Sequence, residues 1–244
     1  MEKVLLHTPE GVRDVYGKEC AVKLTIENSI NKVFNIYGYH NIQTPTFEFF
    51  DIFSKERGSV ASKNLYKFFD REGNTLVLRP DVTPSIARLV AKYYMDVKVP
   101  VKLCYNANTY INNSELQGKL KENTQLGCEL INDDSVEADA EILALVVDSL
   151  KAAGLKEFLV EIGHADFYKG LLEECGFDTE NEQELRKRIE NKNYFGVEEI
   201  LDNNNITGQL KEAFLKLPEL FGSIDVIKSA KELTDNKKAL QSIE

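Results

Sequence analysis

Several residue types are scarce in this chain of 244 residues, which contains no tryptophan, three histidines and four cysteines. The cysteines, Cys20, Cys104, Cys128 and Cys175, lie far apart and form no CxxC pair, so we expect reduced, mostly buried thiols. The histidines are too scattered for a histidine-rich metal site. No apolar run approaches the roughly 18 residues of a membrane span, and the N-terminus lacks a signal-peptide pattern. These absences predict a cytoplasmic protein without a membrane partner.

Basic residues are also in deficit, since 30 Lys and Arg stand against 40 Asp and Glu and give a net charge of −10. Affinity for nucleic acid comes largely from clustered Lys and Arg, so we expect no broad nucleic-acid binding. A local basic patch, or a protein partner with a basic face, remains compatible with this charge. The length fits one large domain, or one domain with a small appendage.

Common cofactor and catalytic motifs are missing as well. The chain has no GxGxxG, GxSxG or HExxH segment. The pair Gly118-Lys119 fails as a phosphate-binding loop, because position 113 is Asn instead of Gly and position 120 is Leu instead of Ser or Thr. We therefore predict no cofactor, and a bound nucleotide would need another kind of site.

Apolar periodicity and turn residues predict mixed helices and strands in the first 177 residues. Helices are expected at 18–37, 83–95, 136–153 and 167–175, and strands at 39–45, 101–105, 109–111, 122–131 and 158–163. A hairpin is expected at 65–79, with its turn at 70–74. The strand that ends at Pro45 should lie at a sheet edge or stop there, because proline cannot donate to a central ladder.

Four phenylalanines follow that strand at positions 47, 49, 50 and 53. They fit either a core cluster or a self-complementary dimer face. After Gly176 the composition shifts toward Glu, Asn, Lys and Arg. We therefore predict a core at 1–177, a small helical insertion or lobe at 178–217 and a helical return segment at 218–244.

Two stretches suggest a binding site. In residues 78–84, a strand stops at Arg79-Pro80, and Thr83-Pro84 has the form of a helix N-cap followed by proline, which places Asp81 just outside the helix. In residues 125–129, Gln125 and Glu129 share one face of a strand, with Gly127 between them. Asp81, Thr83, Gln125 and Glu129 suit a small cationic or amphoteric ligand. The alternative is a strand whose polar residues face water.

The chain resembles the histidyl-tRNA synthetase family, and more closely its non-catalytic branch, the regulatory subunits of short-form ATP phosphoribosyltransferase. Four segments carry the resemblance in order and spacing: TPEGVRD at 8–14, GYHNIQTPTFE at 38–48, LRPDVTPSIAR at 78–88 and QLGCE at 125–129. The similarity runs over about residues 6–175. It implies an α+β fold of the class II aminoacyl-tRNA synthetase type, an antiparallel sheet flanked by helices, which forms dimers.

The resemblance also implies roles for the four site residues. Asp81, Thr83 and Gln125 would hold the amino group of histidine, and Glu129 would face its imidazole ring. This fits the chemistry, since carboxylates favour an ammonium group and Gln can donate and accept hydrogen bonds.

Departures from the family pattern separate its two branches. The synthetases clamp the ATP α-phosphate with an Arg in the second class motif, and this chain has Ile111 at that position. Where the synthetases have an acidic residue nearby, this chain has Asn113. The Phe-His that precedes the synthetases' Gln is Asn123-Thr124 here. Losing a phosphate clamp typically costs several kcal/mol of transition-state stabilisation. We therefore expect a non-catalytic regulatory subunit in histidine biosynthesis, which senses histidine and allosterically controls the short-form catalytic subunit.

Two alternatives remain at this stage: a divergent or truncated histidine–tRNA ligase, and a dimerisation module with a vestigial pocket. The family's later segments, an Arg-Gly-Leu-Asp-Tyr-Tyr-like stretch and a third motif, do not occur in these 244 residues. We therefore expect an N-terminal fragment of the class II fold.

Overall fold

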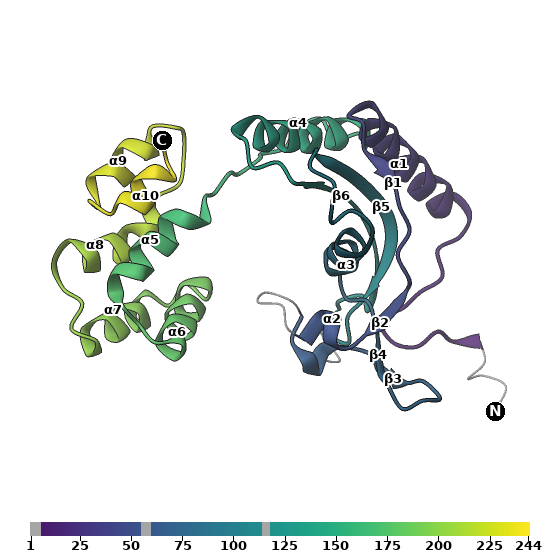
Figure 1. Cartoon of the computed structure of the whole chain (residues 1–244), viewed down its shortest axis with the longest axis horizontal. Coiled ribbons are helices and arrows are strands. Elements are labelled where there is room, and N and C mark those ends of the chain that lie inside the picture. The colour runs from purple at the N-terminus through teal and green to yellow at the C-terminus, as the bar shows by residue number, and fades with distance from the viewer. Residues whose placement is uncertain (1–5, 55–59, 114–117) are drawn as a thin grey trace. The chain divides into compact units, whose positions relative to one another are not determined.

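The computed structural model describes residues 6–54, 60–113 and 118–244 (Figure 1). The chain divides into two compact units, Met1–Leu159 and Val160–Glu244, which are described separately here. In the first unit the elements run α1 (Gly17–Ile36), β1 (His40–Asn41), β2 (Phe47–Phe49), α2 (Asp51–Ser54), η2 (Ser62–Asn64), β3 (Lys67–Phe69), β4 (Thr75–Leu78), α3 (Thr83–Tyr93), β5 (Val101–Tyr110), β6 (Glu122–Ile131) and α4 (Val136–Ala152).

The strands of the first unit form two three-stranded sheets, in the orders β1-β5-β6 and β2-β4-β3. Strands β5 and β6 are long and antiparallel, and Tyr105 lies opposite Gly127 in their register. The expected antiparallel character holds for every pair except β1 with β5, which run parallel. Strand β1 is short and lies at the sheet edge, in agreement with the prediction from Pro45.

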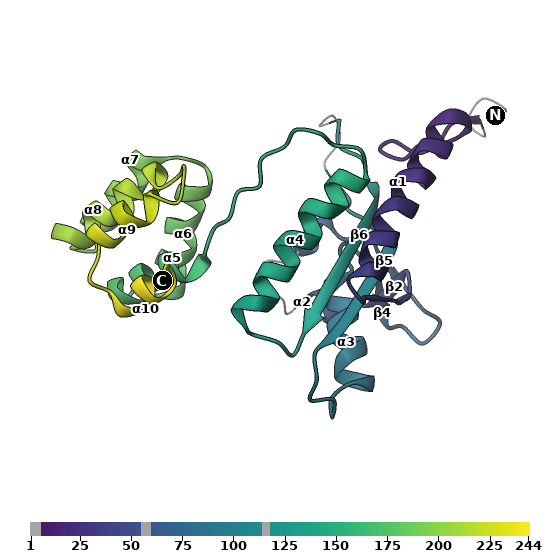
Figure 2. The same ribbon diagram turned by 90° about the horizontal axis from the view of Figure 1, so that it is seen from above.

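Helices cover both faces of the larger sheet. Helices α1 and α4 lie side by side over one face, and α3 lies on the other (Figures 1 and 2). Alternate residues of β5 and β6 therefore enter two different apolar layers. The layer beneath α1 and α4 holds Phe34, Tyr39, Cys104 and Leu145, and the layer beneath α3 holds Val82, Ile86, Val101, Leu103 and Tyr105. The position of each residue in the strand thus sets which helix it meets.

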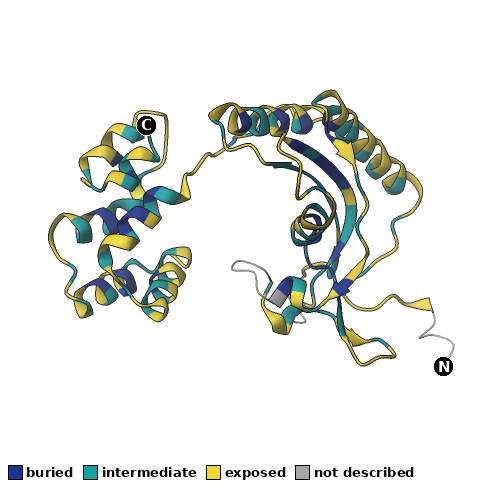
Figure 3. Ribbon diagram, viewed as in Figure 1, coloured by how far each residue is buried: buried dark blue, intermediate teal, exposed yellow. Residues whose placement is uncertain are grey.

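The expected aromatic cluster is divided between core and surface. Phe53 is buried in a small core with Leu65 and Val77, whereas Phe47 and Phe49 are more than half exposed on β2 (Figure 3). Phe47 makes an edge-on contact with Phe68 of β3, at 5.8 Å between ring centroids. The core interpretation holds for Phe53, whereas a dimer face formed by the exposed phenylalanines stays a prediction.

The second unit is helical, with α5 (Ala165–Cys175), α6 (Thr179–Glu190), α7 (Tyr194–Asn203), α8 (Gly208–Lys216), η3 (Leu217–Glu219), α9 (Val226–Glu232) and α10 (Lys237–Gln241). One apolar cluster joins these helices, and its buried members include Phe167, Leu171, Leu185, Leu201 and Phe214. Helix α5 belongs to this cluster, so the units divide after Leu159, whereas the sequence placed the end of the core at residue 177.

Most predicted elements are confirmed, with two differences. Strand β5 is continuous from Val101 to Tyr110, where the sequence suggested two segments. The prediction of a strand at 158–163 is wrong. That segment forms neither helix nor strand, and Leu159 and Ile162 are largely exposed. Its apolar residues have no partner strand or covering layer to hold them in a sheet. Among the described residues, no helix combines the length and apolar character needed to cross a membrane.

Candidate functional site

The four site residues predicted from the sequence come together between the start of α3 and the face of β6 that it covers. The Thr83 hydroxyl donates a hydrogen bond of 2.7 Å to Glu129 Oε1. Thr83 is the first residue of α3, and Val82 occupies the N-cap position without a side-chain capping bond. The predicted capping role of Thr83 is therefore wrong, because its hydroxyl turns across to β6 instead of closing its own helix.

The second link joins Asp81 to Gln125. Gln125 Nε2 donates to Asp81 Oδ1 at 3.2 Å, and the same oxygen accepts a 2.7 Å hydrogen bond from the Val82 amide. The amide bond fixes the carboxylate at the entrance to α3, while Gln125 approaches it from the sheet. The alternation along β6 thus has the predicted effect, since Gln125 and Glu129 both face the start of α3.

Tyr105 is a site residue that the sequence reasoning missed. It lies on β5 directly opposite Gly127, it is only 4% exposed, and its hydroxyl interacts with the Thr83 side chain. A β-carbon at Gly127 would lie 2.5 Å from Tyr105 Cζ, so no larger residue fits there. Gly127 therefore makes room for the tyrosine ring beside Gln125 and Glu129 on β6. Gly127 is the sequence feature that could have indicated a large side chain opposite it. The identity of that side chain depends on the register of β5 against β6, which nearby residues do not reveal.

The site carries excess negative charge. Burial raises the pKa of Glu129, the nearby Asp81 carboxylate raises it further, and the Thr83 hydrogen bond opposes this rise. Burial, together with the charges of Glu129 and Asp81, also raises the pKa of Tyr105 to about 12, so this residue is a neutral hydroxyl near neutral pH. Two carboxylates with neutral donors around them favour a ligand that brings a positive charge and several N–H groups.

Ile111, Asn123 and Thr124, which the sequence suggests as departures from the synthetase pattern, lie outside this cluster. Ile111 directly follows β5, and its amide donates to the Lys121 carbonyl at 2.9 Å. Thr124 Oγ1 donates to Asn108 Oδ1 at 3.0 Å, and the Asn123 side chain donates to the Leu120 carbonyl at 3.4 Å. The side chain at 111 is an aliphatic group that cannot donate hydrogen bonds to a phosphate.

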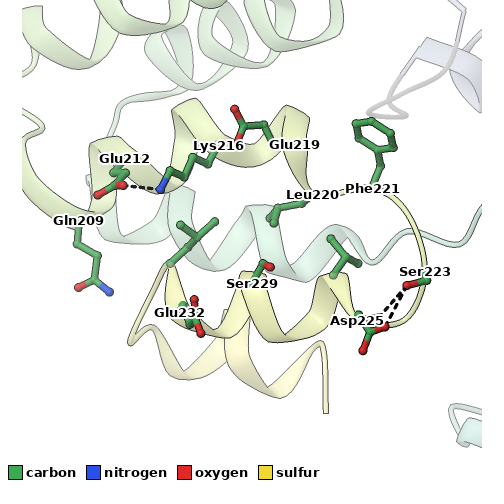
Figure 4. A pocket seen from close by; sticks show the side chains of 12 residues that line it. Gln209, Glu212, Lys216, Glu219, Leu220, Phe221, Ser223, Asp225, Ser229 and Glu232 are labelled. Carbon is green, nitrogen blue, oxygen red and sulfur yellow. Dashed lines mark hydrogen bonds and ion pairs between the residues drawn. The ribbon is translucent and has the colours of Figure 1, made fainter.

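A separate cavity of about 610 Å³ lies within the helical unit, between α8 and α9 (Figure 4). Its lining includes the acidic residues Glu212, Glu219, Asp225 and Glu232. Lys216 is paired with Glu212 at 2.6 Å, and Asp225 is paired with Lys228 at 2.9 Å. Apolar residues such as Leu220, Val226 and Leu233 complete the lining.

Comparison with known proteins assigns the family. A family model described as histidyl-tRNA synthetase matches residues 11–244. The chain belongs to the histidyl-tRNA synthetase family. Within it, the chain is 46% identical over its full length to an ATP phosphoribosyltransferase regulatory subunit of Ruminiclostridium cellulolyticum, and 41% identical over 98% of its length to that of Acetivibrio thermocellus. These matches confirm the resemblance to the regulatory branch of the family. The chain spans 58% and 57% of the lengths of these two relatives.

Solved structures of family members confirm the class II synthetase-like fold. A Bacillus halodurans structure described as an ATP phosphoribosyltransferase regulatory subunit/histidyl-tRNA synthetase matches with a TM-score of 0.87 and 35% identity, over 98% of this chain and 62% of that one. A histidyl-tRNA synthetase of Nostoc matches with a TM-score of 0.76 at 16% identity, over 97% of this chain and 55% of that one, which supports the fold alone.

Proposed function

We propose that this chain is the histidine-sensing part of a non-catalytic regulatory subunit, which controls a short-form ATP phosphoribosyltransferase catalytic subunit in the cytoplasm. The names of its relatives support the regulatory role. The observation that carries the sensing role is the Thr83–Glu129 and Asp81–Gln125 pairing, which gathers two carboxylates and their donors at one end of α3.

The proposed ligand fits the chemistry of this cluster. The ammonium group of histidine would sit among Asp81, Thr83 and Gln125, where a carboxylate, a hydroxyl and an amide oxygen accept its hydrogen bonds. The imidazole ring would face Glu129, whose carboxylate accepts a ring N–H. Tyr105 would border the ring with a neutral hydroxyl. A bound cation would relieve the repulsion between Glu129 and Asp81, so binding should favour the ionised form of Glu129.

Ile111 separates sensing from adenylation in this proposal. An enzyme that activates histidine must stabilise negative charge that develops on the ATP phosphate, and an aliphatic side chain cannot do so. A sensor needs only the amino-acid pocket. Its control of a partner requires that histidine binds one quaternary arrangement better than another, because a ligand shifts an equilibrium only by its differential affinity.

A thermal-unfolding panel with histidine, ATP and both together tests the proposal. A ligand that binds only the folded state stabilises it in proportion to ln(1 + [L]/Kd). We expect stabilisation by histidine alone and none by ATP. In the assembled complex with the catalytic subunit, Glu129→Ala should abolish inhibition by histidine. Unchanged inhibition in that variant would contradict the assignment of the pocket.

A histidine–tRNA ligase is the second candidate, because the matching family model is that of the synthetases. It predicts histidine-dependent exchange between ATP and pyrophosphate, together with thermal stabilisation by ATP that histidine strengthens. A dimerisation module with a vestigial pocket predicts that neither ligand shifts the unfolding temperature. Size measurement by sedimentation would test the proposed dimer separately.

A further inference from the structure

Arg79 is a buried cation that has no carboxylate partner among the described residues. It is 6% exposed and lies at the end of β4. Its Nε donates to the Asn108 carbonyl at 2.8 Å, and its Nη1 donates to the Thr44 and Pro45 carbonyls at 2.8 and 3.1 Å. These neutral oxygens satisfy hydrogen bonds, but they do not neutralise the charge, and a buried charge is costly unless it is paired.

The acidic side chain that acts electrostatically on Arg79 is hydrogen-bonded to a different arginine. Glu48 acts on Arg79 electrostatically, but its Oε1 accepts hydrogen bonds from Nε and Nη2 of Arg88, at 3.1 and 2.7 Å. The ion pair of Glu48 is therefore formed with Arg88, and Arg79 keeps only a longer-range interaction with this carboxylate. Burial lowers the pKa of Arg79, which is the direction expected when the charged form lacks compensation.

Arg79 also lines a cavity of about 380 Å³ between the segment after β1 and strand β5. The lining consists of Ile42, Gln43, Thr44, Thr46, Arg79, Tyr105, Asn106, Ala107, Asn108 and Tyr110. Arg79 is the one charged residue in this set, and the others are neutral. A cavity whose charge comes from a single guanidinium attracts anions and disfavours cations.

Free donors remain around this cation. Among the described residues, Nη2 of Arg79, the Gln43 amide and the Thr46 hydroxyl have no hydrogen-bond acceptor. Other polar lining groups are occupied, since Asn106 donates to Glu27 at 2.9 Å, and Asn108 donates to Glu122 at 2.7 Å. Glu27 and Glu122 do not line the cavity. Gln43 and Thr46 are exposed and can donate as well as accept hydrogen bonds, so together with Arg79 Nη2 they can supply the donors that an anion requires.

From this geometry we infer that the Arg79 cavity is a binding site for a phosphate or carboxylate group. A guanidinium with an unused nitrogen suits these planar or tetrahedral oxyanions better than a spherical ion. Two sources supply that chemistry: a small free anion, or a carboxylate side chain from a second copy of this chain. The lining shares Tyr105 with the proposed histidine site, but the charge of this cavity is positive and its donors are different.

Inorganic phosphate is the probe for the free-anion source. Its effect on thermal unfolding is measured at constant ionic strength, with KCl as the balancing salt, for the wild-type chain, Arg79→Lys and the double variant Gln43→Ala/Thr46→Val. Hydrogen bonds to charged groups contribute about 1.5–3 kcal/mol, so Arg79→Lys should weaken apparent phosphate affinity about ten-fold or more. Arg71→Gln is the matched control, because it removes an exposed arginine from the hairpin turn of the same unit.

Sedimentation velocity on the same samples distinguishes the second source. If a second copy supplies the carboxylate, Arg79→Lys and added phosphate should both shift the wild-type dimer toward monomer, whereas Arg71→Gln should not. The double variant leaves the carbonyl contacts of Arg79 intact, and it reports on the site if Arg79→Lys fails to fold. If neither phosphate stabilisation nor assembly responds to Arg79→Lys or to the double variant, the inference is overturned. Histidine binding is measured separately and does not enter either outcome.

Discussion

Thr83 on helix α3 donates its hydroxyl hydrogen to Glu129 on strand β6, 46 residues further along the chain, at 2.7 Å. This bond fastens the first residue of the helix to the sheet that the helix covers. It uses a hydroxyl that would otherwise cap the helix, so α3 begins without a side-chain cap. The hydrogen bond from Gln125 to Asp81 forms a second link between β6 and the residues just before α3. The proposed ligand contacts and the placement of the helix therefore depend on the same groups.

Replacing Thr83 by Val should make stability depend on pH. The Thr83 hydroxyl favours the ionised form of Glu129, whose pKa is raised by burial. Since Thr83 is exposed, Thr83→Val should cost at most about 1 kcal/mol at pH values above the folded-state pKa of Glu129. This difference should shrink as pH falls through that pKa, because the carboxyl group becomes protonated in both proteins. Urea unfolding between pH 4 and about 8 measures it, and Thr83→Ser should restore wild-type behaviour.

Glu129→Gln should stabilise the ligand-free chain and remove its response to histidine. The raised pKa of Glu129 means that its ionised form destabilises the folded state, a cost that is present above the folded-state pKa and absent at low pH. Since Glu129 is only partly buried, the gain at pH 7 should stay below about 1 kcal/mol. Urea unfolding with and without histidine tests both effects. Glu72→Gln, at an exposed turn, is the control that should change neither.

Gly127→Ala should destabilise the first unit through Tyr105. The added β-carbon meets the tyrosine ring at 2.5 Å, and overpacking of this kind costs about 1–3 kcal/mol. A double-mutant cycle with Tyr105→Ala should be strongly non-additive, because the smaller side chain removes the clash. Gly163→Ala has open space around its β-carbon and should be nearly neutral. Additive effects of Gly127→Ala and Tyr105→Ala would contradict direct packing between these positions.

Arg88→Gln should be far more harmful than removal of a surface arginine. Arg88 pairs with Glu48, which is 7% exposed, and its loss leaves a buried carboxylate without its hydrogen-bonded ion-pair partner. Breaking such a pair costs about 3–5 kcal/mol. Arg186 forms a similar bond to Glu190 on the exposed surface of α6, where a pair contributes at most about 1 kcal/mol. Equal shifts in unfolding free energy for Arg88→Gln and Arg186→Gln would refute this ranking.

The sequence predicted that the four residues proposed for the site would lie together, because local rules place them. Pro84 marks the start of α3, and the two-residue period of β6 puts Gln125 and Glu129 on one face. Tyr105 escaped prediction, since its position depends on which β6 residue lies opposite it, and that register is a non-local property. The buried role of Arg79 escaped for the same reason: its acceptors, at Thr44, Pro45 and Asn108, are distant in sequence.

The segment between α4 and α5 also differs from its prediction. Residues 158–163 have the apolar content of a strand, yet they remain outside any sheet, because a strand also needs a neighbour to pair with. The domain boundary was misplaced for a related reason. Composition changes after Gly176, but Phe167 and Leu171 of α5 already pack into the helical core. Burial partners, and not composition, set where one unit ends.

Each unit builds its apolar clusters from its own residues, which bears on how heat unfolds the chain. Each core has its own apolar contacts to lose on heating, so calorimetry should resolve two transitions instead of one. The enthalpy from total heat absorbed would then exceed the van't Hoff enthalpy fitted to a single two-state curve. Histidine should move the transition of the first unit alone, so a single scan would report ligand binding and carry its own internal reference.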